Sequence, residues 1–317
     1  MKVVSLFSGA GGFDLGLIQA GHEVVWANDI LEDACATYAN NIGGHIHLGD
    51  ITEIDFSSLS GADLVVGGFP CQGFSMANME RRRDDPRNLL YLEFLRAVSE
   101  VKPKYFIAEN VRGILSLDQG KVFAKVMSDF QDSGYFTQHL LLNAADFGVP
   151  QNRYRVFILG VRRDLEIFPE FKLIKGFGKT GKPWRTIGEA LKDIPDPEES
   201  HNLKNHVYSK FKFNDNGYMN HRRLDPNKPS PTITARGDLK GGAMVNLHPK
   251  NHRRLSVREM AIIQTFPMNF EFHGAMTSCY LQLGNAVPPL LAKQLGEFLS
   301  SLDQGDFTPR SQLNMPV

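Results

Sequence analysis

The first 165 residues alternate between strand-like and helix-like segments, and this alternation constrains the fold more than any other feature. Leu90, Phe94, Val98 and Val101 recur at the spacing of one helical face. Short apolar runs typical of strands lie at residues 2–7, 23–27, 63–67, 105–108, 139–142 and 155–161, with another strand expected before Asp50, and helix-like segments occupy residues 13–20, 31–41 and 122–130. The pattern predicts an α/β fold with a doubly wound, mostly parallel sheet, whose ligands lie beyond the carboxyl ends of its strands.

The alternation stops after about residue 170, where Gly, Pro, Lys and Asn dominate, and a helical pattern returns at residues 281–299. The intervening segment therefore looks like an insertion into the first domain. We expect one domain from residues 1–170 plus 277–308, a second, smaller domain from residues 171–276, and a disordered tail at residues 309–317.

The charge of the chain is zero overall but unevenly distributed. Residues 172–258 contain 18 Lys and Arg against 8 Asp and Glu, so the remainder is acidic. A basic segment of this kind is typical of a polyanion-binding face, although a solvated Lys-rich loop region has the same composition. The charge pattern leaves both interpretations open.

The sequence argues against several classes of protein. No apolar run is long enough to span a membrane, and the three cysteines are too far apart for a disulfide framework or a Cys-based zinc site. His248 and His252 flank Pro249 without a Cys partner, so we expect no metal site. We expect a soluble intracellular protein.

Three polar features follow the predicted strands at the edge where a ligand would bind. They are the Gly-rich segment Ser8-Gly9-Ala10-Gly11-Gly12, the carboxylate of Asp29, and the pair Asp50-Ile51. Separately, the first could be a ligand-free turn and the second a helix N-cap. Together they fit a nucleoside cofactor, with Asp29 on the ribose and Asp50-Ile51 on adenine.

A thiol and two charged groups lie at neighbouring strand ends. Cys71 follows Pro70 at the end of a strand, a position that suits a nucleophile, although free cysteines are more often buried and inert. Glu109 closes the next strand and could pair with a heterocyclic base. Arg153 and Arg155 are two residues apart, which in a strand places both on one face, where they could hold Glu109 and an exocyclic oxygen.

These segments resemble those of the DNA (cytosine-5)-methyltransferases of the bacterial and phage restriction–modification type. The matching blocks cover nearly the whole chain: LFSGAGGFDLG (6–16), ND (28–29), GDI (49–51), GGFPCQGFS (67–75), ENV (109–111), QNRYR (151–155), RLSVREMAIIQTFP (254–267) and LGNAVP (283–288). The resemblance implies the S-adenosylmethionine-dependent methyltransferase fold with a smaller target-recognition domain at residues 171–276.

The resemblance also implies site residues. The cofactor would be S-adenosyl-L-methionine, bound by Phe7, Gly9, Gly12, Asp29, Ile30, Asp50, Ile51, Pro70, Leu90, Asn285, Ala286 and Val287. Ile30 stands where some relatives carry an aromatic residue that stacks on adenine. Cys71 would attack C6 of a flipped-out cytosine, while Glu109 handles a proton at N3. Arg155, with Arg153, would hold Glu109 and the base O2.

The implied partner is double-stranded DNA, bound between the two domains by a monomer without membrane contact. Candidate DNA contacts are Gln72, Ser75, Arg81, Arg222, Arg223, Thr234, Arg236, Arg253 and Arg254, whereas Arg258 and Glu259 are expected to organise the smaller domain. The resemblance places the protein in the bacterial cytoplasm, on the nucleoid. A cognate restriction endonuclease would act on the same DNA site without forming a stable complex.

Two other functions share this scaffold. One is a tRNA cytosine-5 methyltransferase, disfavoured by the sizeable basic segment and the absence of a Cys-Phe-Thr signature. The other is a DNA-binding module without activity, disfavoured because Cys71, Glu109, Arg153 and Arg155 are all present. The recognition sequence is not readable from the chain.

Overall fold

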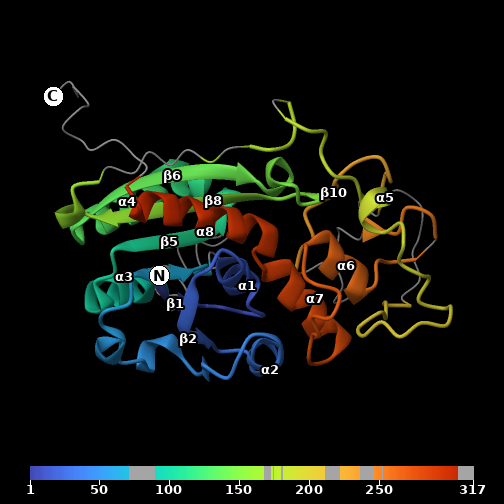
Figure 1. The fold of residues 1–317 in the computed structure, drawn as a ribbon, viewed down its shortest axis with the longest axis horizontal. Helices are drawn as coiled ribbons and strands as arrows, with labels where there is room; N and C mark the ends of the chain where they lie inside the picture. Colours follow the sequence, from blue (N-terminus) through green and yellow to red (C-terminus); the bar gives the residue numbers. More distant parts are fainter. Residues whose placement is uncertain are drawn as a thin grey trace.

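A seven-stranded sheet forms the centre of the computed structural model, with strand order β3-β2-β1-β4-β5-β8-β6 (Figure 1). The strands are β1 (Lys2–Leu6), β2 (Glu23–Asp29), β3 (Ile46–Leu48), β4 (Leu64–Gly67), β5 (Tyr105–Val111), β6 (Tyr135–Asn143) and β8 (Tyr154–Arg162). Neighbouring strands are parallel except for β8, which runs antiparallel to β5 and β6. The doubly wound, mostly parallel α/β sheet predicted from the sequence is confirmed.

The structure describes residues 1–70, 90–167, 173, 175–179, 181–210, 222–235, 246–251 and 253–305. Cys71, Gln72, Ser75, Arg81 and Arg236 lie outside these ranges, as does His252. In the described part of the chain, no helix is both long enough and apolar enough to cross a membrane.

Helices cover both faces of the sheet and bury two separate apolar cores. One core contains Leu17 of α1 and Leu295 of α8, and the other contains Phe94 of α3 and Phe130 of α4. The described helices are α1 (Gly12–Gln19), α2 (Glu32–Asn41), α3 (Leu90–Val101), α4 (Lys121–Asp132), α5 (Ile187–Ala190), α6 (Val257–Ile263), α7 (Met276–Asn285) and α8 (Pro289–Asp303). Short 3₁₀ segments lie at Ile51–Glu53, Ser57–Leu59, Arg112–Gly120, Ala144–Phe147 and Arg163–Leu165.

The central strands read as continuous apolar runs because both of their faces are buried. In β4, Leu64 and Val66 enter the core beneath α1 and α8, whereas Val65 enters the core beneath α3 and α4. Because β1, β2, β4 and β5 are parallel, their carboxyl ends meet at one edge of the sheet, where the predicted site residues lie.

A third apolar core lies beyond this edge, around α5, α6 and α7 (Figure 1). It joins Ile187 and Leu224 to Leu255 and Leu283, and it also takes in Ala10 from the loop after β1. The short strands there pair as β7 (Gln151–Asn152) with β10 (Ser230–Pro231) and β9 (Arg222–Arg223) with β11 (Asn246–Leu247). The helical pattern at residues 281–299 is two helices, α7 and α8, separated at Ala286–Pro288, and α7 packs with α6 while α8 packs on the sheet.

Candidate active site

The loop between β1 and α1 has a left-handed backbone at three positions, two of which are glycines. Phe7, Gly9 and Gly11 have φ angles of 55°, 55° and 83°, in the left-handed region. A Cβ atom at Gly12 would lie 2.4 Å from the carbonyl oxygen of Val287, whereas one at Gly9 would meet nothing within 4 Å. The loop thus packs against the segment returning from the C-terminal part on one side and leaves its backbone open at Gly9.

Asp29 is fixed at the end of β2 by backbone donors. Its Oδ2 accepts from the Gly9 N–H at 2.8 Å, and its Oδ1 accepts from the Leu31 N–H at 2.9 Å. Burial raises the pKa of Asp29, and the N–H groups of Leu31, Gly9 and Ile30 oppose that shift. The carboxylate is therefore held beside the Gly-rich loop, where sequence reasoning placed the ribose.

The predicted adenine-reading residues lie one strand further along, after β3. The Asp50 carboxylate accepts from the backbone N–H and the hydroxyl of Thr52, at 3.0 and 2.9 Å, and these bonds lower its pKa. Ile51 is buried, whereas the Ile30 side chain is 63% exposed at the end of β2. Ile30 thus offers an exposed aliphatic side chain next to Asp29.

The other predicted cofactor residues approach the loop from different parts of the chain. A Cβ atom at Gly12 would lie 3.3 Å from the Cβ of Ala286, so residues 286–287 contact the start of α1. Asn285 is exposed, and Pro70 and Leu90 are half-buried where the described chain stops and resumes. The structure thus brings Gly12, Ala286 and Val287 together, while Leu90 packs on the core beneath α3.

Glu109 and Arg155 form an ion pair across β5 and β8. The Arg155 Nε lies 2.8 Å from Glu109 Oε1, and the side chains are 11% and 10% exposed. Burial raises the pKa of Glu109, and the positive charge of Arg155 is the largest influence against that shift. The pair therefore places a carboxyl group that can hold a proton beside a fixed cation.

The end of β4 is attached directly to Glu109 and its neighbour. Asn110 donates from Nδ2 to the Phe69 carbonyl oxygen at 3.0 Å. A Cβ atom at Gly68 would lie 2.8 Å from Glu109 Oε2, so glycine leaves room for the carboxylate against the backbone. The chain leading to Cys71 is thereby anchored beside Glu109 as far as Phe69.

Arg153 takes a different course from the one that period-two spacing predicts. It lies between β7 and β8, where the strand is interrupted, and it is fully buried. Its Nη1 and Nη2 donate to the carbonyl oxygens of Ile233 and Gly284, at 3.0 and 2.8 Å. Arg153 thus joins three chain segments, and its positive charge also acts to lower the pKa of Glu109. That Arg153 helps to hold Glu109 stays a prediction.

Sequence reasoning gave no role to two glutamines at this junction. The side-chain Oε1 of Gln151 accepts from the Ile233 N–H at 3.0 Å, and its Nε2 donates to Gln264 Oε1 at 3.0 Å. Gln264 in turn donates to the Leu283 carbonyl oxygen. Both glutamines belong to matching blocks, QNRYR and RLSVREMAIIQTFP, and the first residue of a Q-x-R-x-R motif was the available signal.

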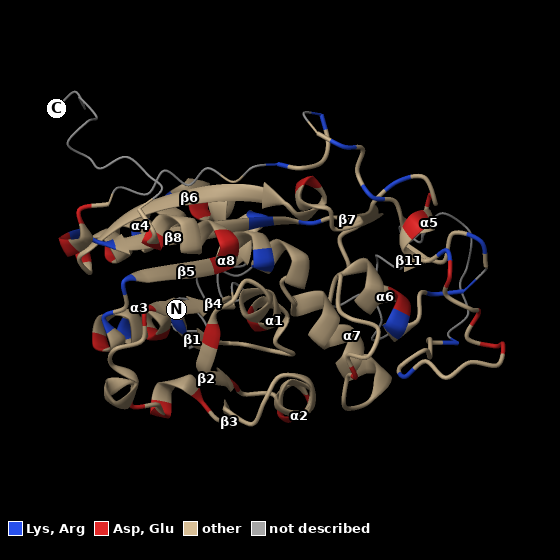
Figure 2. Cartoon of the chain, in the orientation of Figure 1, with Lys and Arg blue, Asp and Glu red and all other residues tan. Residues whose placement is uncertain are grey.

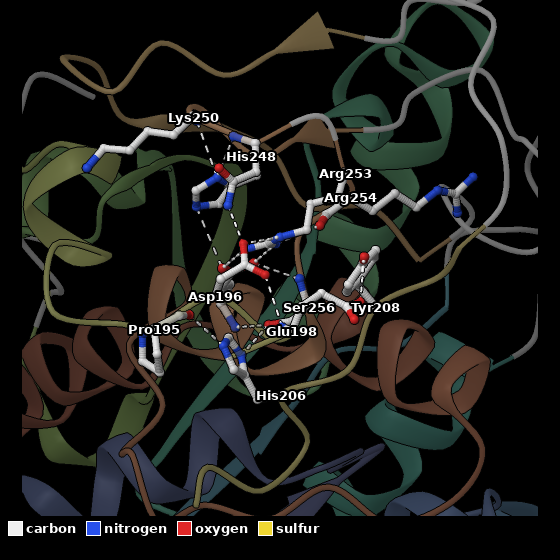
Figure 3. A network of polar contacts seen from close by, with 12 residues as sticks. Pro195, Asp196, Glu198, His206, Tyr208, His248, Lys250, Arg253, Arg254 and Ser256 are labelled. Atoms are coloured by element: carbon white, nitrogen blue, oxygen red, sulfur yellow. Dashed lines mark hydrogen bonds and ion pairs between the residues drawn. The ribbon is translucent and has the colours of Figure 1, made fainter. Parts of the chain in front are cut away.

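Two predicted DNA contacts, Arg253 and Arg254, are buried just before α6. Figure 3 shows Arg253 near Asp196, to which its Nε donates at 3.1 Å. Its two terminal nitrogens donate to Glu259, both at 2.8 Å. Arg254 is 1% exposed. Since neither guanidinium lies on the surface, the prediction that they contact DNA phosphates is wrong for this structure.

The positive charge of Arg253 is paired with the carboxylates of Asp196 and Glu259 inside the protein. Glu259 also accepts from the Ser256 N–H, completing a capping box at the start of α6, and Ser256 contacts His206 at 2.8 Å. Glu259 thus fixes the start of α6 against Arg253. Arg258 donates to the carbonyl oxygens of Lys204, Pro267 and Phe270.

The other predicted DNA contacts differ in exposure. Arg223 is exposed, and its Nη1 donates to the carbonyl oxygens of His248 and Asn251, at 3.4 and 3.2 Å. Thr234 is half-buried, beside Gly284, whose Cβ atom would lie 2.6 Å from the Thr234 carbonyl carbon. Figure 2 shows Lys and Arg along the loops near α5 and β11, interspersed with Asp and Glu.

Among the described residues, no group of three His, Cys, Asp or Glu side chains is arranged to hold a metal ion.

A family model described as C-5 cytosine-specific DNA methylase matches residues 1–301. The chain belongs to this family. It is 40% identical over 91% of its length to the Type II methyltransferase M.NgoFVII of Neisseria gonorrhoeae, covering 83% of that protein. It is 37% identical over 94% of its length to M.BspRI of Lysinibacillus sphaericus, covering 81% of that protein. The chain is thus a C5 cytosine DNA methyltransferase of the Type II restriction–modification kind, as the sequence blocks predicted.

Solved structures show the same fold. A prophage-encoded DNA modification methyltransferase of E. coli superposes with a TM-score of 0.79, at 26% identity over 96% of this chain and 99% of that one. The S. pombe Dnmt2 methyltransferase superposes with a TM-score of 0.74 at 20% identity, over 96% and 99% of the two chains. The second likeness concerns the fold alone. S-adenosylmethionine use and a DNA substrate are what the family implies.

Proposed function

We propose that this methyltransferase transfers a methyl group from S-adenosyl-L-methionine to C5 of a flipped-out cytosine in a specific duplex DNA sequence. Cys71 forms a transient covalent bond to the base. The enzyme acts as a monomer and protects host DNA from a cognate restriction endonuclease. The observation that carries the proposal is the buried Glu109–Arg155 pair, at the sheet edge that also holds the cofactor segments.

The residues present fit S-adenosylmethionine. The open backbone at Gly9 and the close packing of Gly12 against residues 286–287 make a cradle that a side chain would fill. Asp29 has acceptor capacity left for ribose hydroxyls after its two backbone bonds, and Ile51 and exposed Ile30 offer apolar surface to adenine. When bound, the cofactor supplies an electrophilic methyl group on a sulfonium.

Cytosine needs activation because its C5 is a weak nucleophile. Cys71, as thiolate, forms a bond to C6, and the electrons of the C5–C6 double bond move to the ring as Glu109 gives a proton to N3. Arg155 donates to the base O2 and keeps the Glu109 carboxyl in place. C5 then takes the methyl group. A base removes the C5 proton, the double bond re-forms, Cys71 leaves as thiolate and the N3 proton returns to Glu109.

The raised pKa of Glu109 supports this proton transfer. An ionised carboxylate has no proton to give to N3, whereas burial favours the protonated form of Glu109, which does. The adjacent cation limits the shift, so the group can both give and recover the proton.

We propose that residues 171–276 form the target-recognition domain and that DNA lies between it and the sheet edge. Arg222, Arg223, Thr234 and Arg236 remain proposed contacts, together with Gln72, Ser75 and Arg81 after Cys71. Exposed Arg223 supports the proposal among the described side chains. The target base must flip out of the DNA duplex to reach Glu109, at a cost of about a few kcal/mol.

Bisulfite sequencing of DNA from cells expressing the protein tests the function. Wild type should methylate cytosine in one recurring sequence, and Cys71→Ser should methylate none. Cys279→Ser is the matched control, because that thiol is buried in the third core and burial raises its pKa to about 11. Methylation by Cys71→Ser would overturn the covalent mechanism. Methylation of tRNA but not of duplex DNA would overturn the proposal that duplex DNA is the substrate.

A further inference from the structure

Asn28 is buried at the end of β2 and is 1% exposed. Its side-chain amide donates to two backbone oxygens, those of His47 at 3.1 Å and Gly49 at 3.0 Å. Both bonds reach the segment that leads into Asp50 and Ile51. Because β3 is a three-residue strand at the sheet edge, it has few ladder bonds, and these two side-chain bonds are a large part of what fixes its end.

The backbone of Asn28 is bonded to a second cofactor segment. Its carbonyl oxygen accepts from the Ser8 N–H at 2.9 Å, and its N–H donates to Ser8 Oγ at 3.3 Å. The next residue, Asp29, accepts from the Gly9 N–H. Asn28 is thus bonded to the Gly-rich loop through its backbone and to the segment after β3 through its side chain. The adjoining Asp29 supports the same link, because its carbonyl oxygen accepts from the Gly49 N–H at 3.1 Å.

We propose that Asn28 is a positioning residue for the cofactor, which sets the spacing between the Gly-rich loop, Asp29 and the Gly49–Ile51 segment. It acts through these segments, since a residue this buried has no surface to offer a ligand. An amide suits the position because it presents two N–H donors without charge. The inference rests on the proposed use of S-adenosylmethionine.

Substitution separates this role from a general loss of packing. Asn28→Asp keeps the shape but replaces both donors by a carboxylate facing two carbonyl oxygens, and Asn28→Ser removes the donors without adding charge. The matched control is Asn41→Asp, since Asn41 also donates to two backbone oxygens, those of Thr37 at 2.6 Å and Glu271 at 2.7 Å, away from the cofactor segments.

The test is calorimetric binding of S-adenosylhomocysteine to the full-length proteins, without DNA. Both Asn28 variants should bind about tenfold more weakly or worse, because two hydrogen bonds that align the site are lost, and Asn41→Asp should bind as wild type does. Binding of duplex DNA should be unchanged in all of them. Asn28→Asp should recover affinity relative to Asn28→Ser as the pH falls, since the neutral acid regains one donor.

The outcomes distinguish the two proposals. If wild type fails to bind S-adenosylhomocysteine, the proposed cofactor use is wrong. If wild type binds and the Asn28 variants bind as tightly, or Asn41→Asp weakens binding to the same extent, the positioning role is wrong. If Asn28→Asp does not fold, the Asn28→Ser affinity decides alone.

Discussion

Replacing Arg155 by Met should expose how much the Glu109–Arg155 pair contributes to stability. The two charged atoms are 2.8 Å apart and both side chains are about nine-tenths buried. Their attraction is about 6 kcal/mol at an effective dielectric constant of about 20. Desolvation of both ions offsets part of this attraction, so we expect Arg155→Met to destabilise the fold by about 3–5 kcal/mol, the cost of leaving one buried charge unpaired.

The loss should depend on pH with a defined sign. Burial raises the pKa of Glu109, and removing its nearest cation raises it further. A carboxyl whose folded pKa is raised contributes stability that is complete below its unfolded pKa of about 4.3 and is lost as the pH rises through the folded value. Arg155→Met should therefore be less stable at pH 8 than at pH 5, by more than wild type is.

Urea unfolding of wild type, Arg155→Met, Glu109→Gln and the double variant, at pH 5 to 8, measures this effect. Glu109→Gln should restore much of the stability that Arg155→Met loses at pH 8, because no carboxylate is left to bury. If the double variant shows the same pH dependence as Arg155→Met, the reasoning that Glu109 is the titrating group is refuted.

Three further predictions concern other parts of the site. Gly12→Ala should weaken S-adenosylhomocysteine binding and cost about 1–3 kcal/mol of stability, measured by calorimetry and thermal unfolding, while Gly44→Ala, which meets no atom within 4 Å, should change neither. Burial raises the pKa of Asp14 to about 6, so wild type should lose about 3 kcal/mol of stability between pH 3 and pH 7 that Asp14→Asn does not lose. Equal pH slopes of the two proteins in unfolding experiments would contradict this. Arg223→Gln should reduce the slope of log K for DNA binding against log salt concentration by about 0.9. Arg253→Met should instead destabilise the fold around α6. A reduced slope for a folded Arg253→Met variant would show that Arg253 contacts DNA.

The strands of the sheet were predictable from the sequence because the central strands are buried on both faces. Leu64–Val66 is apolar for that reason, and the spacing from Leu90 to Val101 reflects the single buried stripe of α3. The break between α7 and α8 was missed because apolar residues continue through it. Pro288 and Pro289 were the available signal, since proline is tolerated at the start of a helix.

Site residues were predictable where the residue type decides the role. They were not predictable where the role depends on the path of the backbone. Asp29 and Glu109 lie at strand ends, as expected. The hydrogen bonds of Arg153 to Ile233 and Gly284 were not predictable, because the strand stops between β7 and β8 and no residue type signals that interruption. The counting of charges likewise missed that Arg253 has two carboxylate partners, one of them from distant Asp196.

The residues of the capping box at Ser256 and Glu259 were visible in the sequence, and they predict the start of α6. The two bonds from Asn28 to the end of β3 were not predictable in the same way. They depend on the pairing of Asn28 with His47 across two strands, which a single sequence does not specify.

The most direct test of the account uses duplex DNA carrying 5-fluorocytosine at the site that bisulfite sequencing identifies. Fluorine at C5 cannot leave as a proton, so the bond between Cys71 and C6 should persist after methyl transfer. Wild type and Cys279→Ser with S-adenosylmethionine should give a protein–DNA adduct that survives denaturing electrophoresis, and Cys71→Ser should give none. A duplex methylated by wild type without a stable adduct, or an adduct formed by Cys71→Ser, would contradict the central claim.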